Sequence, residues 1–192
     1  MKSKQGKFIL SIVIVVVIVI ALGFILNNKS VTGPGKYDDF AKALKSQGAE
    51  FYGAFWCPHC QSQKAMFGSS KKYMPYTECS NPNRSQTQVC IDKKIETYPT
   101  WYFKDGITVT SSAEPIACKV QPSNDSTENP ICASIGSQST PTWKFAEHAF
   151  SIKSPSEPIK EGNVWKFSPE ASATGEVPLE FLAKQINFTL PQ

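Results

Sequence analysis

The chain has 192 residues, and its 20 Lys and Arg side chains outnumber its 16 Asp and Glu side chains, which gives a formal net charge of +4 at pH 7. Three of the lysines lie within the first seven residues, so the rest of the chain is nearly neutral, with 17 basic against 16 acidic residues. No stretch combines clustered Lys and Arg with interleaved aromatic residues, which argues against a nucleic-acid-binding surface.

The N-terminal segment is typical of a membrane anchor. Residues 1–7 are basic, and residues 8–26 form an uncharged run of 19 residues dominated by Ile and Val. A helix of that length extends about 28 Å, close to the thickness of the bilayer hydrocarbon. The run ends without an obvious small-x-small cleavage site, which favours an uncleaved signal anchor. Because more lysines precede the run than closely follow it, we expect a single-pass protein of the cell membrane with a cytoplasmic N-terminus and an extracytoplasmic catalytic domain.

The elements that follow alternate between helices and strands. Residues 27–35 contain a Gly-Pro-Gly sequence and are expected to form a linker. Apolar spacing and turn residues then predict helices and strands in the order of an α/β domain. The predicted helices cover residues 37–47, 57–67, 86–94 and 178–187, and the predicted strands cover residues 50–56, 73–79 and 97–103.

The most informative motif, Cys57-Pro58-His59-Cys60, lies between a predicted strand and a predicted helix. A cysteine at a helix start is stabilised as thiolate by unpaired N–H groups and by the helix dipole, and proline suits the first turn. Two cysteines at this spacing can close a disulfide, so we predict that Cys57 attacks and Cys60 resolves. No cofactor is expected.

Metal binding is the alternative interpretation of this motif. A zinc or copper site would need further ligands, and the chain has only His59 within the motif and the distant His148, which is expected at the surface. We therefore expect no metal. A metal-handling or client-binding module without exchange activity is the alternative function.

The other four cysteines are expected to form structural disulfides. Six cysteines fit an oxidising compartment, and they allow 15 pairings. Their positions in sequence favour Cys79 with Cys90 and Cys118 with Cys132, each closing a short polar loop. Two alternatives stay open: Cys79 and Cys90 could form a second redox pair, or the topology could be reversed, with a cytoplasmic reductase domain whose thiols are free.

Residues 37–101 resemble the thioredoxin-like domains that are fused to, or associated with, bacterial homologues of vitamin K epoxide reductase. A further match lies near the C-terminus, at residues 175–176 and 179–183. The residues that carry the resemblance are Tyr52-Gly53-Ala54-Phe55-Trp56-Cys57-Pro58-His59-Cys60, Gln63-Lys64, Phe67-Gly68, Tyr76-Thr77-Glu78-Cys79, Cys90 and Tyr98-Pro99-Thr100-Trp101.

This resemblance implies a thioredoxin-like fold and thiol–disulfide exchange with a quinone-linked membrane partner similar to vitamin K epoxide reductase or to DsbB. It also implies that Pro99 is cis and faces the dithiol, and that Tyr98 and Pro99 contact substrate. Trp56, directly before Cys57, is expected to contact substrate as well and to shield the site rather than react. The clients would be cysteine-containing secreted proteins.

The two residues between the cysteines indicate the direction of electron flow. Pro58-His59 is the pair found in the oxidant DsbA, and a histidine here can stabilise the thiolate, which makes the disulfide more oxidising. The reduction potentials of DsbA and thioredoxin differ by about 150 mV, or about 7 kcal/mol for two electrons. We therefore expect an oxidase.

The chain departs from the family pattern after residue 103. Residues 36–104 and 164–192 are assigned to the thioredoxin-like domain, which leaves residues 105–163 as a disulfide-stapled insertion. The pattern of Cys90, Pro99-Thr100-Trp101 and Phe103 recurs 42 residues later at Cys132, Pro141-Thr142-Trp143 and Phe145, as a partial internal repeat. Either Pro99 or Pro141 could lead the strand beside the dithiol, and the spacing from Cys57 favours Pro99. Residues 164–167 are expected to be the strand that returns to the domain, and the insertion is either a stapled excursion or a recognition lobe.

Overall fold

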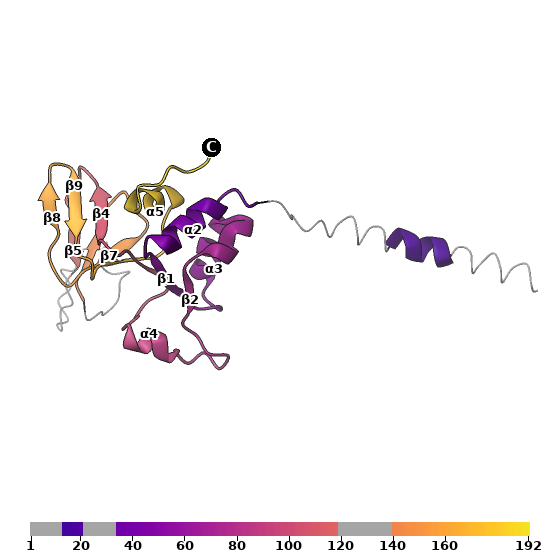
Figure 1. Cartoon of the computed structure of the whole chain (residues 1–192). Coiled ribbons are helices and arrows are strands. Elements are labelled where there is room, and N and C mark those ends of the chain that lie inside the picture. The colour runs from indigo at the N-terminus through magenta and orange to yellow at the C-terminus, as the bar shows by residue number, and fades with distance from the viewer. Residues whose placement is uncertain (1–12, 21–33, 119–139) are drawn as a thin grey trace, which may run out of the picture. The chain divides into compact units, whose positions relative to one another are not determined.

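The computed structural model describes residues 13–20, 34–118 and 140–192 (Figure 1). The chain divides into two units, Met1–Pro34 and Gly35–Gln192. In the first unit, residues 13–20 are helical and their apolar side chains are exposed. Within the described ranges, no helix has the length and apolar character needed to cross a membrane. The remainder of the predicted anchor, the basic segment 1–7 and most of the linker lie outside the described residues.

The second unit contains short helices and strands in the predicted order over its first half. Each element is shorter than predicted, because turns and a 3₁₀ helix take residues from the element ends. These elements are α2 (Asp38–Ser46), β1 (Glu50–Gly53), α3 (Pro58–Met66), the 3₁₀ helix η1 (Gly68–Tyr73), β2 (Tyr76–Glu78), α4 (Gln88–Asp92) and β3 (Thr100–Tyr102).

The second half is mostly β-structure and ends with a helix. The elements are β4 (Ile107–Thr110), β5 (Ile116–Cys118), β6 (Thr142–Lys144), β7 (Ser151–Lys153), β8 (Ile159–Glu161), β9 (Val164–Phe167), β10 (Ser172–Thr174) and α5 (Leu179–Gln185).

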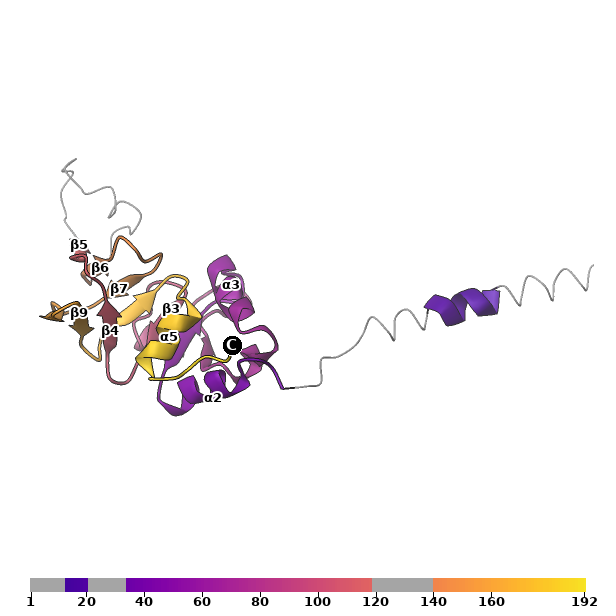
Figure 2. The same cartoon turned by 90° about the horizontal axis from the view of Figure 1, so that it is seen from above.

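Seven of these strands form a central sheet in the order β2-β1-β3-β10-β7-β6-β5, seen from two directions in Figures 1 and 2. Strands β1 and β2 are parallel, and every other neighbouring pair in the sheet is antiparallel. A second sheet has the order β4-β9-β8. Apart from the residues that the structure does not describe, the unit is a mixed α/β arrangement with a central sheet flanked by helices, which is compatible with a thioredoxin-like fold.

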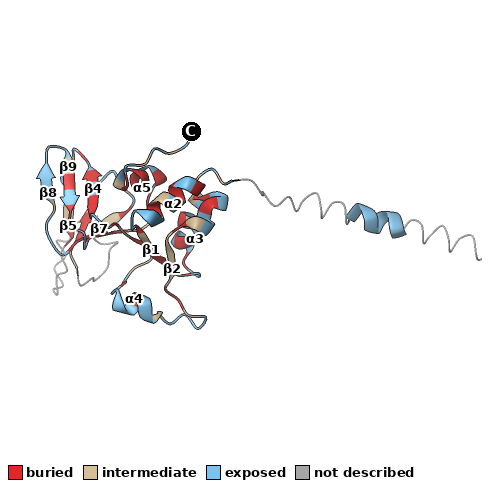
Figure 3. Ribbon diagram, viewed as in Figure 1, coloured by how far each residue is buried: buried red, intermediate tan, exposed pale blue. Residues whose placement is uncertain are grey.

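The main core lies on one face of the central sheet. Phe51 of β1 stacks on Trp101 of β3 at 4.5 Å between ring centroids, and both are fully buried. Leu44 of α2 and Leu182 of α5 belong to the same core, so both helices cover this face of the sheet. The buried residues of the two helices are red in Figure 3. Adjacent strand residues point to opposite faces, so Tyr52 packs on the other side, in a small cluster around the Cys79–Cys90 disulfide.

The insertion shares this core and extends the sheet. In the register across the sheet, Trp101 is followed by Ala173, Ile152 and Trp143 on successive strands. Two strands from the insertion, β7 and β6, thus continue the row of paired residues that contains Trp101 of β3. Trp143 belongs to the same buried cluster as Phe51. The insertion is therefore not a separate lobe: three of its strands are central-sheet strands.

One prediction about this half is wrong, and a second holds only in part. Residues 164–167 do form a strand, β9, but it pairs with β4 and β8 in the second sheet, and β10 pairs with β3 instead. Strand β10 consists of the small residues Ser172-Ala173-Thr174, which carry no apolar signal in sequence. His148, which was expected at the surface, is half-buried, because its ring lies among Phe145, Phe150 and Phe181.

Candidate functional site: a dithiol at a helix N-terminus

Cys57 lies in the turn between β1 and α3 and acts as the N-cap of that helix. Its Sγ accepts a hydrogen bond from the backbone N–H of Cys60 at 3.4 Å, and Pro58 occupies the first turn. The N-terminal N–H groups of a helix favour negative charge on a capping atom. Cys57 and Cys60 are both free thiols in the structure, so the site is in its reduced form.

The two cysteines differ in access and in acidity. Cys57 keeps 5% of its surface exposed, whereas Cys60 is completely buried. Burial, followed by the hydrogen bond with Cys57, raises the pKa of the Cys60 thiol to about 12. Cys60 therefore stays protonated at neutral pH, and Cys57 is the sulfur that a partner can reach.

Room for Cys60 depends on a glycine in β1. A Cβ at Gly53 would lie 2.9 Å from Cys60 Sγ and 3.1 Å from a ring carbon of Tyr76. The absence of a side chain at residue 53 thus allows the second thiol to pack directly against the strand.

Pro99 lies beside the dithiol. The Tyr98–Pro99 peptide bond is cis, and Tyr98 O accepts a hydrogen bond from Cys57 Sγ at 3.8 Å. Since β3, which follows Pro99, pairs with β1, the structure places Pro99 rather than Pro141 at this position. Pro141 leads β6, three strands away from β3 in the sheet.

Two aromatic residues flank Cys57. The rings of Trp56 and Tyr98 meet edge to face, with centroids 6.1 Å apart, and Trp56 is 40% exposed. Trp56 Nε1 donates to Ser80 Oγ at 2.8 Å, and Gln86 Nε2 donates to Tyr98 OH at 2.9 Å. Burial raises the pKa of Tyr98, so its hydroxyl is neutral. Both rings are thus held in place at the entrance to the dithiol.

Two carboxylates that were given no role from the sequence, Glu78 and Glu176, contact the site. Glu78 Oε1 accepts hydrogen bonds at 3.0 Å from the backbone N–H groups of Phe55 and Ser80, and Tyr76 OH donates to Glu78 Oε2 at 2.7 Å. Glu78 therefore anchors the turn that carries Cys57. Its partners are up to 23 residues away in sequence, so the motif that contains Glu78 did not indicate this role.

The second carboxylate is Glu176, which lies 2.7 Å from Nδ1 of His59. The pair joins positions 117 residues apart, and the His59 side chain is 70% exposed. A buried amide supports the same connection: Gln63 exchanges two hydrogen bonds with the backbone of Val177. The segment after β10 is thus fastened to the active-site helix.

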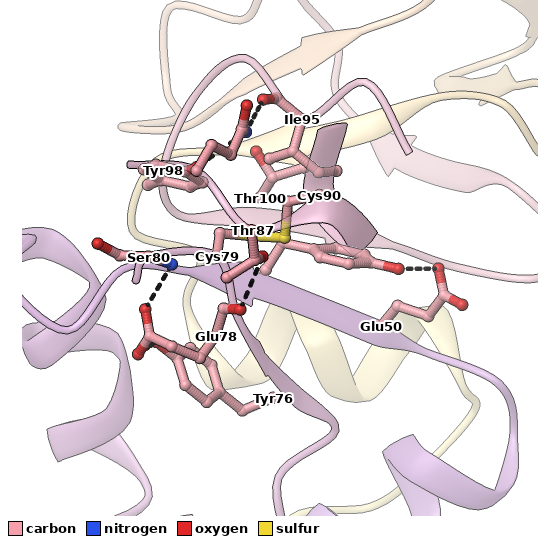
Figure 4. The surroundings of a disulfide bond; sticks show 12 residues. Glu50, Tyr76, Glu78, Cys79, Ser80, Thr87, Cys90, Ile95, Tyr98 and Thr100 are labelled. Carbon is pink, nitrogen blue, oxygen red and sulfur yellow. Dashed lines mark hydrogen bonds between the residues drawn. A yellow bond between two sulfur atoms is a disulfide. The ribbon is translucent and has the colours of Figure 1, made fainter. Parts of the chain in front are cut away.

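The second cysteine pair lies behind this entrance. Cys79 and Cys90 form a disulfide, drawn in Figure 4. Both residues are fully buried. Cys118 is also disulfide-bonded, and its predicted partner Cys132 lies outside the described residues. Burial keeps the Cys79–Cys90 sulfurs away from a client thiolate, which agrees with a structural role.

Metal ligands do not gather around the dithiol in the part of the chain that the structure describes. Within those residues, no group of three or more His, Cys, Asp or Glu side chains is arranged to hold a metal ion. His59, the nearest histidine in sequence, is bonded to Glu176.

Comparison with known proteins finds a similarity over part of the chain. No protein-family model matches the sequence. Over 72 residues, or 35% of this chain, the sequence is 44% identical to the thiol-disulfide oxidoreductase LTO1 of Arabidopsis thaliana. The match covers 19% of that relative, so the chain spans about a fifth of its length. Over this segment the chain is similar to a thiol–disulfide oxidoreductase.

Proposed function

We propose that the protein is a membrane-anchored thiol–disulfide oxidoreductase that transfers the Cys57–Cys60 disulfide to secreted proteins. The observation that carries this proposal is the pair of free thiols at the start of α3, where Cys57 keeps 5% of its surface exposed and Cys60 is completely buried. The similarity to a relative named as a thiol-disulfide oxidoreductase supports the general reaction.

The exchange proceeds in two balanced steps. A client thiolate attacks Cys57 Sγ of the oxidised protein, the Cys57–Cys60 bond breaks, and Cys60 leaves and takes up a proton. A second client thiolate then attacks the client sulfur of the mixed disulfide and releases Cys57 as a thiolate. The client loses two electrons and two protons; the dithiol of the protein gains both electrons and one proton, on Cys60, and the other proton goes to solvent.

Two features support the oxidase direction. Cys57 is the N-cap of α3, a position at which the helix N–H groups in general favour a thiolate, and stabilising the reduced form raises the reduction potential. His59, the second residue of the same helix, is the residue of the motif on which the expectation of an oxidase rests. The high pKa of Cys60 assigns it the role of the buried resolving thiol.

Sustained oxidation needs an electron acceptor. We propose that a quinone-linked membrane protein, similar to vitamin K epoxide reductase or DsbB, reoxidises the dithiol by accepting its two electrons through disulfide exchange. Support for the membrane location comes from the sequence, in the apolar run 8–26 and the lysines before it. An extracytoplasmic position would give the dithiol access to secreted clients.

The reduction potential of the full-length protein tests the direction. We expect a value nearer to that of DsbA, about −120 mV, than to that of thioredoxin, about −270 mV, in glutathione buffers. His59→Ser should make it more negative by about 30 mV, which corresponds to about 1.4 kcal/mol for two electrons. Ser62→Ala, an exposed change on the same helix, is the control and should leave the potential unchanged. A wild-type value near that of thioredoxin would rule out the oxidase role.

A trapping experiment tests the partners. In Cys60→Ser the resolving thiol is absent, so mixed disulfides on Cys57 accumulate and can be identified by mass spectrometry. Secreted proteins and a quinone-linked membrane protein are the expected partners. Trapping that is no greater than in Cys57→Ser would contradict exchange chemistry.

A further inference from the structure

A groove of about 380 Å³ lies beside the dithiol and is lined by residues from three segments. Trp56 and Tyr98 form the part nearest to the reactive sulfur, since Trp56 precedes Cys57 in the chain and Tyr98 O lies 3.8 Å from Cys57 Sγ. Ile95, which also lines the groove, is buried and lies close to the disulfide in Figure 4. A peptide whose cysteine reaches Cys57 therefore places its neighbouring residues at this groove.

Two charged residues line the groove, Arg84 and Glu96. Glu96 is paired with Lys153 of β7, whose side chain is only 10% exposed. Among the described residues, no carboxylate lies within ion-pair distance of Arg84. With Glu96 neutralised by Lys153, the groove presents the uncompensated positive charge of Arg84.

The loop closed by the Cys79–Cys90 disulfide holds the backbone of Arg84 in place. Residue 84 has a positive φ of 66°, and its N–H donates to Asn81 O at 2.8 Å. Asn81 N in turn donates to Ser85 O at 2.8 Å. The disulfide between residues 79 and 90 closes the loop that contains this turn, so the disulfide and the turn together keep Arg84 at the groove.

We propose that this groove is a recognition subsite for a client peptide that carries a Glu or Asp side chain close to its reactive cysteine. Arg84 binds the client carboxylate, and Trp56 and Tyr98 contact the peptide on either side of the cysteine. Guanidinium and carboxylate form charge-assisted, often bidentate, hydrogen bonds. This inference rests on the proposed exchange function and adds a preference for acidic client segments.

The test uses the oxidised full-length protein and synthetic peptides that each contain two cysteines. The peptides carry Glu or Gln at one of the two positions on either side of the first cysteine and are otherwise identical. At one or more of these positions, kcat/KM for the Glu peptide should exceed that for the Gln peptide about fivefold, the scale of a partly exposed ion pair. The ratio should fall as salt is added.

Variants of Arg84 distinguish binding of the client carboxylate by this residue from a general effect of the net charge of the protein. Arg84→Gln should bring the Glu-to-Gln ratio to about one while the Gln peptide reacts at the wild-type rate, and Arg84→Lys should keep part of the preference. The matched control is Lys94→Gln, because Lys94 is also exposed, has a positive φ of 56° and does not line the groove. It should retain the full ratio.

Reduced dithiothreitol, which has no flanking side chain, reports exchange alone and should react equally with all variants. A Glu-to-Gln ratio near one at every position in the wild type, or an unchanged ratio in Arg84→Gln, would overturn the subsite while leaving the proposed function intact. Failure to oxidise dithiothreitol and both peptides would overturn the proposed function, and this inference with it.

Discussion

Gly53 in β1 lies so close to Cys60 that a Cβ atom at residue 53 would be 2.9 Å from the Cys60 Sγ. This contact places the resolving thiol against the central sheet, where it is fully buried. The position of the Cys60 sulfur thus depends on Gly53, seven residues earlier, which has no side chain to take part in the exchange.

We expect Gly53→Ala to lower the free energy of unfolding by about 1 to 3 kcal/mol, because it overpacks a filled site. It should also displace Cys60 and slow the closing of the Cys57–Cys60 disulfide. Chemical denaturation and stopped-flow oxidation measure the two effects. Gly162→Ala is the control for the oxidation rate alone, since nothing lies within 4 Å of the added Cβ but the positive φ of 61° at residue 162 itself costs stability; its oxidation rate should be that of the wild type. Normal oxidation in Gly53→Ala would contradict the assigned contact.

The reduced protein should alkylate at Cys57 well before Cys60. With a pKa of about 12, only about one Cys60 in ten thousand is thiolate at pH 8, and the side chain is inaccessible. Iodoacetamide labelling followed by peptide mass spectrometry gives the order. Denaturation should remove the difference, and faster labelling of Cys60 in the folded protein would reverse the assigned roles.

Glu78→Gln should weaken the turn that carries Cys57. The carboxylate accepts two backbone hydrogen bonds and one from Tyr76, and an amide with a single acceptor oxygen cannot replace all three. We expect a loss of about 1 to 3 kcal/mol in unfolding free energy and slower peptide oxidation. Glu50→Gln, which changes a half-exposed carboxylate at the other end of β1, should cost less than about 1 kcal/mol. Equal costs for the two variants would argue against an anchoring role of Glu78.

The Glu96–Lys153 pair should respond asymmetrically to substitution. Glu96→Gln leaves the buried Lys153 ammonium uncompensated, so unfolding free energy should fall by about 1 to 3 kcal/mol. Lys153→Met should cost less than about 1 kcal/mol, because Glu96 is partly exposed and can be hydrated. The exposed pair Lys160–Glu114 provides the control, and Glu114→Gln should have almost no effect. Thermal and urea unfolding distinguish these cases, and a larger loss in Lys153→Met would refute the asymmetry.

His148 should make stability depend on pH. Burial among aromatic rings lowers the pKa of His148 below its usual 6.5, with opposing effects from Glu147 and Lys184. Below pH 6.5 the unfolded chain therefore binds this proton more readily than the folded one, so unfolding free energy should rise with pH from the lowered pKa up to about pH 6.5. Urea unfolding at several pH values measures this slope, and His148→Phe should reduce it. An unchanged slope in His148→Phe would exclude this residue as its source.

Local pattern was sufficient for the chemistry of the dithiol. Cys57-Pro58-His59-Cys60 after an apolar strand predicted a thiol at a helix N-terminus, because capping and helix start depend on a few neighbouring residues. The pairing of Cys79 with Cys90 also followed from a short loop. The cis Pro99 was expected from the family resemblance, and the structure shows it.

Contacts between distant residues were decided only by the tertiary structure. Strand β10, with small residues and no apolar pattern, takes the position beside β3, while the more apolar β9 joins another sheet, because pairing depends on the whole arrangement of strands. Glu78, Glu176 and Arg84 reach the site through folding over separations that no periodicity encodes. The sequence thus determined which sulfur atoms can react, and the fold determined what holds them and what lies beside them.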